Sequence, residues 1–217
     1  MTAAAGDDGG RLSIATSDPP DAAAEQQLQQ FLRLLAKWNR VYNLTAITDP
    51  ARMWTHHVLD SLSLVTVLDP LLASSATKRL LDVGSGAGLP GIPLAIVRHD
   101  WEWTLLDSNS KKTAFTQQAI ADLQLSNATV ATARVEAFGG GPFAAVVSRA
   151  FASLADFVEK TRHLLAPGGC WVAMKGSVPE DELMALPANV VCTDIVRLHV
   201  PGLDAQRHAL LLKVKAG

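Results

Sequence analysis

Large apolar side chains recur at every third or fourth position in the segment that begins at Glu25. This spacing predicts an amphipathic helix, because it gathers the apolar groups on one face. A second helix is expected to begin at Pro50, with Asp49 as its N-cap, and its apolar positions continue through Val65. We therefore expect two helices in segment 25–72.

Short apolar runs alternate with helical patterns in the rest of the chain. The runs of strand length end at Val83, Asp107, Ala133, Ser148 and Lys175. This alternation predicts a parallel sheet with helices on both faces. The last two runs, 190–200 and 208–214, are separated by a turn that contains Pro and Gly, which predicts an antiparallel hairpin. Segment 73–217 is thus expected to form one α/β domain.

The first 24 residues hold Ala, Gly, Asp, Ser and Pro and hardly any large apolar side chain. Such a segment cannot repay the entropy of ordering, so we expect a disordered tail over 1–24. It lacks the basic start and the apolar run of a signal peptide, and the chain has no unbroken apolar run of membrane length. The expectation is a soluble, cytoplasmic monomer that does not enter a membrane.

The charge of the chain argues against general nucleic-acid binding. The net charge is −2, and the tail holds four Asp against one Arg, so −2 − (−3) leaves +1 for the remainder. Any affinity for RNA must therefore come from a local basic patch. The two cysteines, Cys170 and Cys192, form no CxxC motif and have no clustered histidines, so we expect no metal site.

A glycine-rich turn joins the expected strand that ends at Val83 to the next helix. The spacing of its glycines matches the motifs that bind two different cofactors. Gly84-x-Gly86-x-Gly88 fits the turn of S-adenosylmethionine (SAM) methyltransferases, whereas Gly86-x-Gly88-x-x-Gly91 matches the dinucleotide fingerprint. The dinucleotide fingerprint should start where the strand ends, but Gly86 comes late. The register therefore favours SAM.

The next strand ends in Asp107, at the position where an acidic residue accepts hydrogen bonds from a ribose diol. This carboxylate serves SAM and NAD equally. An NAD-dependent oxidoreductase therefore stays open as an alternative, and so does a ribosome-associated protein that holds SAM as a sensor and transfers nothing.

A mostly parallel sheet that ends in a hairpin, preceded by helices, resembles the class I SAM-dependent methyltransferase fold, which is Rossmann-like. Several separated motifs between Trp38 and Lys213 further resemble the bacterial 16S ribosomal RNA guanine-N(7) methyltransferases, also called glucose-inhibited division protein B. The motifs are Trp38-Asn39-x-x-Tyr42-Asn43-Leu44-Thr45, His57-Val58-Leu59-Asp60-Ser61-Leu62, the glycine run, Leu106-Asp107-Ser108-x-x-Lys111-Lys112, Ser148-Arg149-Ala150-Phe151, Lys175-Gly176, and Val200-Pro201-x-Leu203-x-x-x-Arg207-His208. Their order makes the resemblance specific.

The resemblance implies a set of site residues. SAM would be bound by Gly84, Gly86, Leu89, Asp107, Ser108, Val135, Glu136 and Arg149. Of these, Asp107 and Ser108 would take the ribose, Val135 and Glu136 would flank the adenine, and Arg149 would close the methionine end. The RNA or its target base would be held by Asn43, His57, Arg149 and Arg207. The implied partner is the 16S RNA of the small ribosomal subunit.

The implied reaction needs no general base. Guanine N(7) carries a lone pair and no hydrogen, so it can attack the methyl group of SAM directly. Catalysis is then expected to rest on in-line positioning and on the exclusion of water. The target guanine must be unstacked to reach the site.

Overall fold

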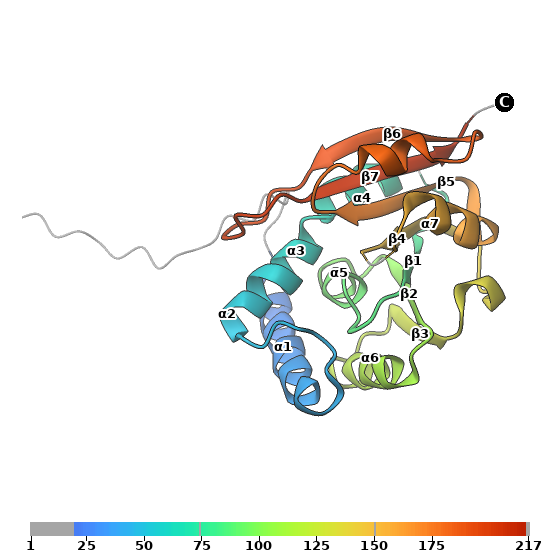
Figure 1. Ribbon diagram of the computed structural model, residues 1–217. Coiled ribbons are helices and arrows are strands. Elements are labelled where there is room, and N and C mark those ends of the chain that lie inside the picture. The colour runs from blue at the N-terminus through green and yellow to red at the C-terminus, as the bar shows by residue number, and fades with distance from the viewer. Residues whose placement is uncertain (1–19, 74, 150, 216–217) are drawn as a thin grey trace, which may run out of the picture.

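The computed structural model describes residues 20–73, 75–149 and 151–215. Its centre is a seven-stranded sheet with the order β3-β2-β1-β4-β5-β7-β6 (Figure 1). The strands are β1 (Arg79–Val83), β2 (Glu102–Asp107), β3 (Ala128–Thr132), β4 (Phe143–Ser148), β5 (Leu165–Lys175), β6 (Val190–Arg197) and β7 (His208–Val214). The first five strands pair in parallel, and β7 lies antiparallel between β5 and β6. The predicted mostly parallel sheet with a terminal antiparallel hairpin is confirmed.

Helices cover both faces of this sheet (Figure 1). They are α1 (Ala22–Tyr42), α2 (Pro50–Met53), α3 (Asp60–Leu62), α4 (Val65–Ala73), α5 (Gly91–Val97), α6 (Ser110–Asp122), α7 (Leu154–Thr161) and α8 (Glu180–Met184), with a π-helical turn η1 (Trp54–Leu59) and 3-10 turns η2 (Val135–Ala137) and η3 (Arg162–Leu164). Successive side chains of β1 point to opposite faces: Leu80 packs into the cluster that contains α1, α5 and α6, and Leu81 into the one that contains α7.

The N-terminal boundary differs from the prediction. Helix α1 begins at Ala22, within the segment 1–24 that we expected to be a disordered tail, so that boundary is wrong by three residues. Asp21 caps the helix by accepting a hydrogen bond from the Ala24 backbone N–H at 2.8 Å, and Ala24 is buried. Residues 1–19 of the predicted tail lie outside the described residues.

The predicted second helix is interrupted. After α2 the chain makes the π-helical turn η1 before it returns to α-helical geometry in α3. Such wide turns are rare and occur often at functional sites. Here η1 carries His57, and Asp60 follows directly after it.

Gly88 shows how tightly the glycine turn packs against α5. Gly88 has φ +76°, and a Cβ there would lie 2.4 Å from Cδ1 of Ile92, whereas Gly168 has φ +75° with no atom within 4 Å of its Cβ position. We expect Gly88→Ala to lower the free energy of unfolding by about 2–4 kcal/mol, from left-handed strain plus overpacking. Gly168→Ala carries the strain alone and should cost about 1–2 kcal/mol. Urea unfolding of both variants checks this, and equal losses would contradict the packing argument.

Candidate active site

The glycine turn is fixed above the end of β2. The backbone N–H groups of Gly84 and Ser85 both donate to the Leu106 carbonyl, at 2.8 and 3.1 Å. The N–H of Gly86 donates to Oδ2 of Asp107 at 2.9 Å. The turn therefore connects the ends of two neighbouring strands, at the edge where open α/β sheets bind ligands.

Asp82 lies under this turn and is fully buried. Its Oδ2 accepts the backbone N–H of Gly91 at 2.9 Å, while its Oδ1 has no hydrogen-bond partner among the described residues. Burial raises the pKa of Asp82 to about 7, against the opposing effects of the Gly91 hydrogen bond and the charge of Arg149. The hydroxyl of Ser85 is buried and equally without a partner in the described part of the chain. Because buried polar groups are normally paired, a polar ligand at the turn suits both.

A first cavity of about 280 Å³ opens at the ends of β1, β2 and β3. Its lining includes Gly84, Asp107, Ser108, Val135 and Glu136. Oδ2 of Asp107 accepts the Gly86 N–H, and its Oδ1 accepts the Asn109 N–H at 2.8 Å, which leaves a second lone pair on each oxygen. A carboxylate held in this way can accept two hydrogen bonds from a ribose diol. The structure thus brings together the residues assigned to adenine and ribose.

A second, larger cavity of about 530 Å³ adjoins the first, because Gly84 lines both. The predicted site residues among its lining are Gly84, Gly86, Leu89, Arg149, His57 and Arg207. Asn43 is not among the lining residues. It is exposed and ends α1 in the left-handed conformation, with φ +49°, while its neighbours Leu44 and Thr45 do line the cavity.

His57 is buried and anchored to the loop that follows α1. Its Nε2 lies 2.9 Å from Oγ1 of Thr45, and the backbone of Thr45 is in turn held on both sides by the Asn39 side chain, at 2.8 and 3.0 Å. Burial, followed by the positive charge of Arg149, lowers the pKa of His57 to about 4. The imidazole is therefore neutral at pH 7.

Asp60 is a site residue that the sequence interpretation missed. Its Oδ1 accepts a hydrogen bond from Nε of Arg207 at 2.8 Å, and its Oδ2 accepts one from Nη1 of Arg149 at 3.2 Å. The residue is 4% exposed and lines the second cavity. The available signal was the single acidic residue between Asp49 and Asp69, in a helical segment with many large apolar side chains, since buried carboxylates are almost always paired.

A second ion pair includes Lys175, which lines the same cavity. Nζ of Lys175 lies 2.9 Å from both carboxylate oxygens of Glu182, and Glu182 also accepts the Leu154 backbone N–H at 2.8 Å. Glu182 belongs to α8, which the apolar pattern did not predict. Lys175 and Lys112 complete, with the two arginines, a cationic lining.

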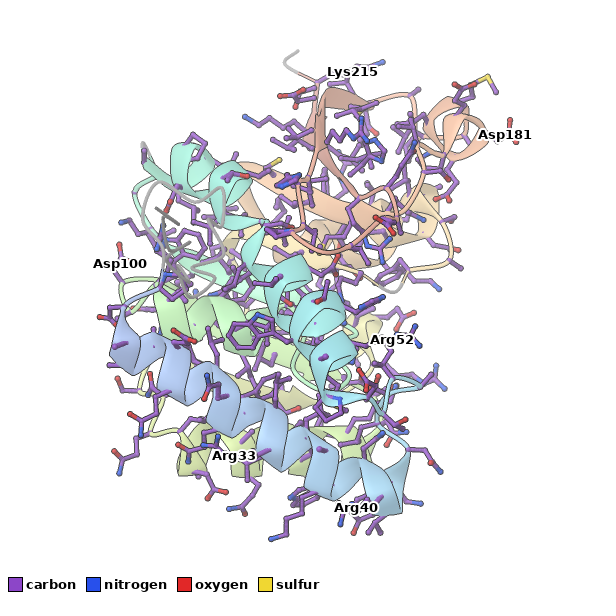
Figure 2. The ribbon with its side chains drawn as sticks, turned by 90° about the vertical axis from the view of Figure 1, so that its left-hand side faces the viewer. Arg33, Arg40, Arg52, Asp100, Asp181 and Lys215 are labelled. Atoms are coloured by element: carbon purple, nitrogen blue, oxygen red, sulfur yellow. The ribbon has the colours of Figure 1, made fainter. Side chains whose placement is uncertain are left out.

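The outer face of the N-terminal helices is also basic. In Figure 2, Arg33 and Arg40 project from α1 on the face toward the viewer, and Arg52 extends from the neighbouring α2. All three side chains are exposed. These three arginines place exposed positive charge on the N-terminal helices, although the overall charge of the chain is close to zero.

Within residues 20–73, 75–149 and 151–215, no group of three or more His, Cys, Asp or Glu side chains could hold a metal ion. No helix in these ranges combines the length and the apolar character needed to cross a bilayer.

Comparison with known proteins identifies the family. Residues 24–211 match the model of the family described as rRNA small subunit methyltransferase G. The chain belongs to this family. It is 49% identical to the Ribosomal RNA small subunit methyltransferase G of Laribacter hongkongensis over 205 residues, which cover 94% of each chain. It is 52% identical to the protein of the same name from Burkholderia ambifaria, over 92% of this chain and 86% of the relative.

The fold is shared with more distant methyltransferases. A SAM-dependent methyltransferase from Geobacter sulfurreducens, solved in complex with S-adenosyl-L-homocysteine, superposes with a TM-score of 0.52 at 14% identity, over 84% of this chain and 98% of that one. The predicted class I SAM-dependent methyltransferase fold and the predicted family are confirmed. Family membership also decides between the two interpretations of the glycine turn, in favour of a methyltransferase and against an NAD-dependent oxidoreductase.

Proposed function

We propose that this protein transfers a methyl group from SAM to N(7) of one guanine in the 16S RNA of the small ribosomal subunit. The observation that carries the proposal is the pair of adjoining cavities. One offers a fixed carboxylate for a ribose, and the other is lined by four cationic side chains. The relatives named as small subunit RNA methyltransferases support the choice of substrate. A cytoplasmic monomer, acting where ribosomes assemble, remains part of this proposal.

The residues of both cavities fit SAM. The first would hold the adenosine through Asp107, Ser108, Val135 and Glu136, and the glycine turn with Leu89 and Arg149 would hold the methionine part. The unpartnered buried atoms of Asp82 and Ser85 supply polar groups beneath the turn. When bound, SAM supplies a methyl group activated by a sulfonium ion.

The second cavity suits a nucleotide of RNA. Four cations line it, namely Lys112, Arg149, Lys175 and Arg207. The basic face of α1 and α2 belongs to the N-terminal helices, which also supply His57 and Asp60 to this lining. Phosphate groups supply most of the affinity in such interfaces. An arginine paired bidentately with guanine covers O(6) and N(7) together and would block the reacting atom. Arg149 and Arg207 are therefore expected to contact phosphate, O(6) alone or the cofactor.

The chemistry of the side chains supports a reaction without a general base. Guanine N(7) has no proton to lose. His57 is neutral at pH 7 but is held against Thr45 by its Nε2, and Asp82 is fully buried against Gly91. The residues of the site therefore act by holding the base in line and by excluding water.

Transfer of label tests the proposed function. The protein is incubated with methyl-labelled SAM and with protein-free 16S RNA, assembling small-subunit particles or finished small subunits. We expect stoichiometric incorporation into one of these RNA forms, and the same reactions show which form is the substrate. SAM binding with no transfer to any of them would identify a sensor and contradict the proposal.

The rate of the single-turnover reaction at saturating SAM is expected to show no inflection that depends on His57 between pH 6 and 8.5. Because the pKa of His57 is about 4, this residue stays deprotonated throughout that range. Gln at position 57 can still reach Thr45, so His57→Gln should keep the rate within about tenfold, whereas the loss of a general base costs about 10²- to 10⁴-fold. A loss of that size, or a sigmoid that disappears in His57→Gln, would contradict the base-free reaction. Asp82→Asn is the control for any inflection near pH 7, where the buried Asp82 titrates.

A further inference from the structure

The two arginines of the second cavity are attached to one buried carboxylate. Asp60 accepts Nε of Arg207 through one oxygen, at 2.8 Å, and Nη1 of Arg149 through the other, at 3.2 Å. We propose that Asp60 is a positioning residue for methyl transfer, which orients both guanidinium groups so that their remaining N–H donors hold the RNA. The inference rests on the proposed function and assigns a role within the same site.

The positions of these residues in the chain explain why a shared carboxylate is needed to orient the two arginines. Asp60 begins α3, Arg149 follows the end of β4, and Arg207 precedes β7, so the partners of Asp60 lie 89 and 147 positions away. An arginine has many rotamers, and fixing one costs entropy that a backbone alone does not repay. A single carboxylate bound to both groups sets their mutual placement and joins the N-terminal helices to the sheet.

The arginines keep donors available for a ligand. A guanidinium has five N–H groups. In the described part of the chain, Arg149 uses Nη1 for Asp60, while Arg207 uses Nε for Asp60 and Nη1 for the Gln206 carbonyl at 2.9 Å. Their side chains are 25% and 26% exposed, against 5% for Asp60. The carboxylate is thus covered and the cations face the cavity.

An acidic side chain in this place has an electrostatic cost, and a gain in folding stability does not account for its presence. A carboxylate in the lining reduces the positive potential that attracts RNA phosphate. Buried ion pairs add little net stability compared with apolar side chains of similar size. The advantage that remains is geometric, since reacting groups misplaced by about 1 Å lose about 100-fold in rate.

The chain offers a matched control in Asp69. This residue of α4 accepts Nη2 of Arg98 at 2.6 Å and Nε at 3.0 Å, and neither residue lines the two large cavities at the glycine turn. Asp69→Asn therefore removes an arginine-bound carboxylate from the same N-terminal helices without touching the site.

The test compares Asp60→Asn with Asp69→Asn and the wild type, at a temperature where circular dichroism shows each protein to be fully folded. We expect Asp60→Asn to lower kcat with small-subunit RNA by about 10- to 100-fold. The Kd for SAM, from calorimetry, should rise by a smaller factor, because Asp60 also orients Arg149 at the methionine end of SAM. Asp69→Asn should leave both values unchanged. A kcat of Asp60→Asn within threefold of Asp69→Asn would overturn the proposal.

A double-mutant cycle with Arg207→Gln separates positioning from an independent role. Because Asp60 also orients Arg149, Asp60→Asn combined with Arg207→Gln should lose more activity than Arg207→Gln alone, but less than the product of the two single losses. Fully multiplicative losses would count against the proposal.

Should Asp60→Asn fail to fold, Asp60→Glu keeps the charge but displaces both guanidinium groups by one methylene. A folded Asp60→Glu with kcat lowered at least about fivefold supports the proposal, and one with full kcat refutes it. A wild type that transfers nothing to RNA would instead refute the proposed function.

Discussion

Replacing Asp107 by Ala is expected to weaken SAM binding by at least about 100-fold. Each hydrogen bond from a ribose hydroxyl to a carboxylate contributes about 1.5–3 kcal/mol, and two such bonds correspond to a factor of more than 100 in Kd. The substitution also releases the Gly86 N–H, so that the glycine turn loses one of its supports.

Calorimetric titration with SAM measures this effect. Asp100→Ala is the matched control. Asp100 lies just before β2, at the opposite end of the strand from Asp107. It is exposed, pairs with Lys78 and lines neither cavity. We expect the control to bind SAM as the wild type does. A Kd for SAM of Asp107→Ala within threefold of the control would show that Asp107 does not bind the ribose.

Replacing Arg207 by Ala is expected to lower kcat/KM for RNA by about 100-fold and to leave the Kd for SAM within threefold. Arg207 lines the second cavity and not the first, and it would supply charge-assisted hydrogen bonds to RNA, of which one or two amount to about 3 kcal/mol. If it contacts a phosphate, the dependence of RNA affinity on salt should also fall by about one unit of slope.

Arg197→Ala serves as the control for charge. This arginine is exposed at the end of β6 and lines neither cavity, so its loss removes one positive charge from the surface and nothing from the site. Equal losses of RNA activity in the two variants would show that only net charge matters. A loss of SAM affinity as large as the loss of activity in Arg207→Ala would place this residue at the cofactor instead.

The sheet could be predicted because its central strands are buried on both faces. All six residues of β4 and four of the five residues of β1 are buried, and most of them are apolar, whereas most of the edge strand β6 is exposed or half-buried. The hairpin followed from two runs separated by a short turn. The carboxylate at the end of β2 followed from the same pattern, since strand ends in a parallel sheet meet at one edge.

Other features leave no local trace. Apolar spacing does not distinguish α-helical from π-helical turns. The sequence therefore could not predict η1, although this turn carries His57. The five-residue α8 has no buried residue and hence no apolar stripe. The partners of Asp60 lie far away in the sequence, and only the folded chain shows that the three side chains meet. The role expected for Asn43 in holding RNA stays a prediction, because this exposed residue lies beside the cavity lining and not in it.

The position of the transferred methyl group on the RNA decides whether N(7) of guanine is the acceptor. Small-subunit RNA treated with the protein and SAM is reduced with borohydride and cleaved with aniline, which breaks the chain only at N(7)-methylguanine, and the products are mapped by primer extension. We predict a single new cleavage site, at one guanine, that is absent when SAM is omitted. Labelled RNA without any new cleavage site would show that the methyl group goes to another atom and would contradict the account.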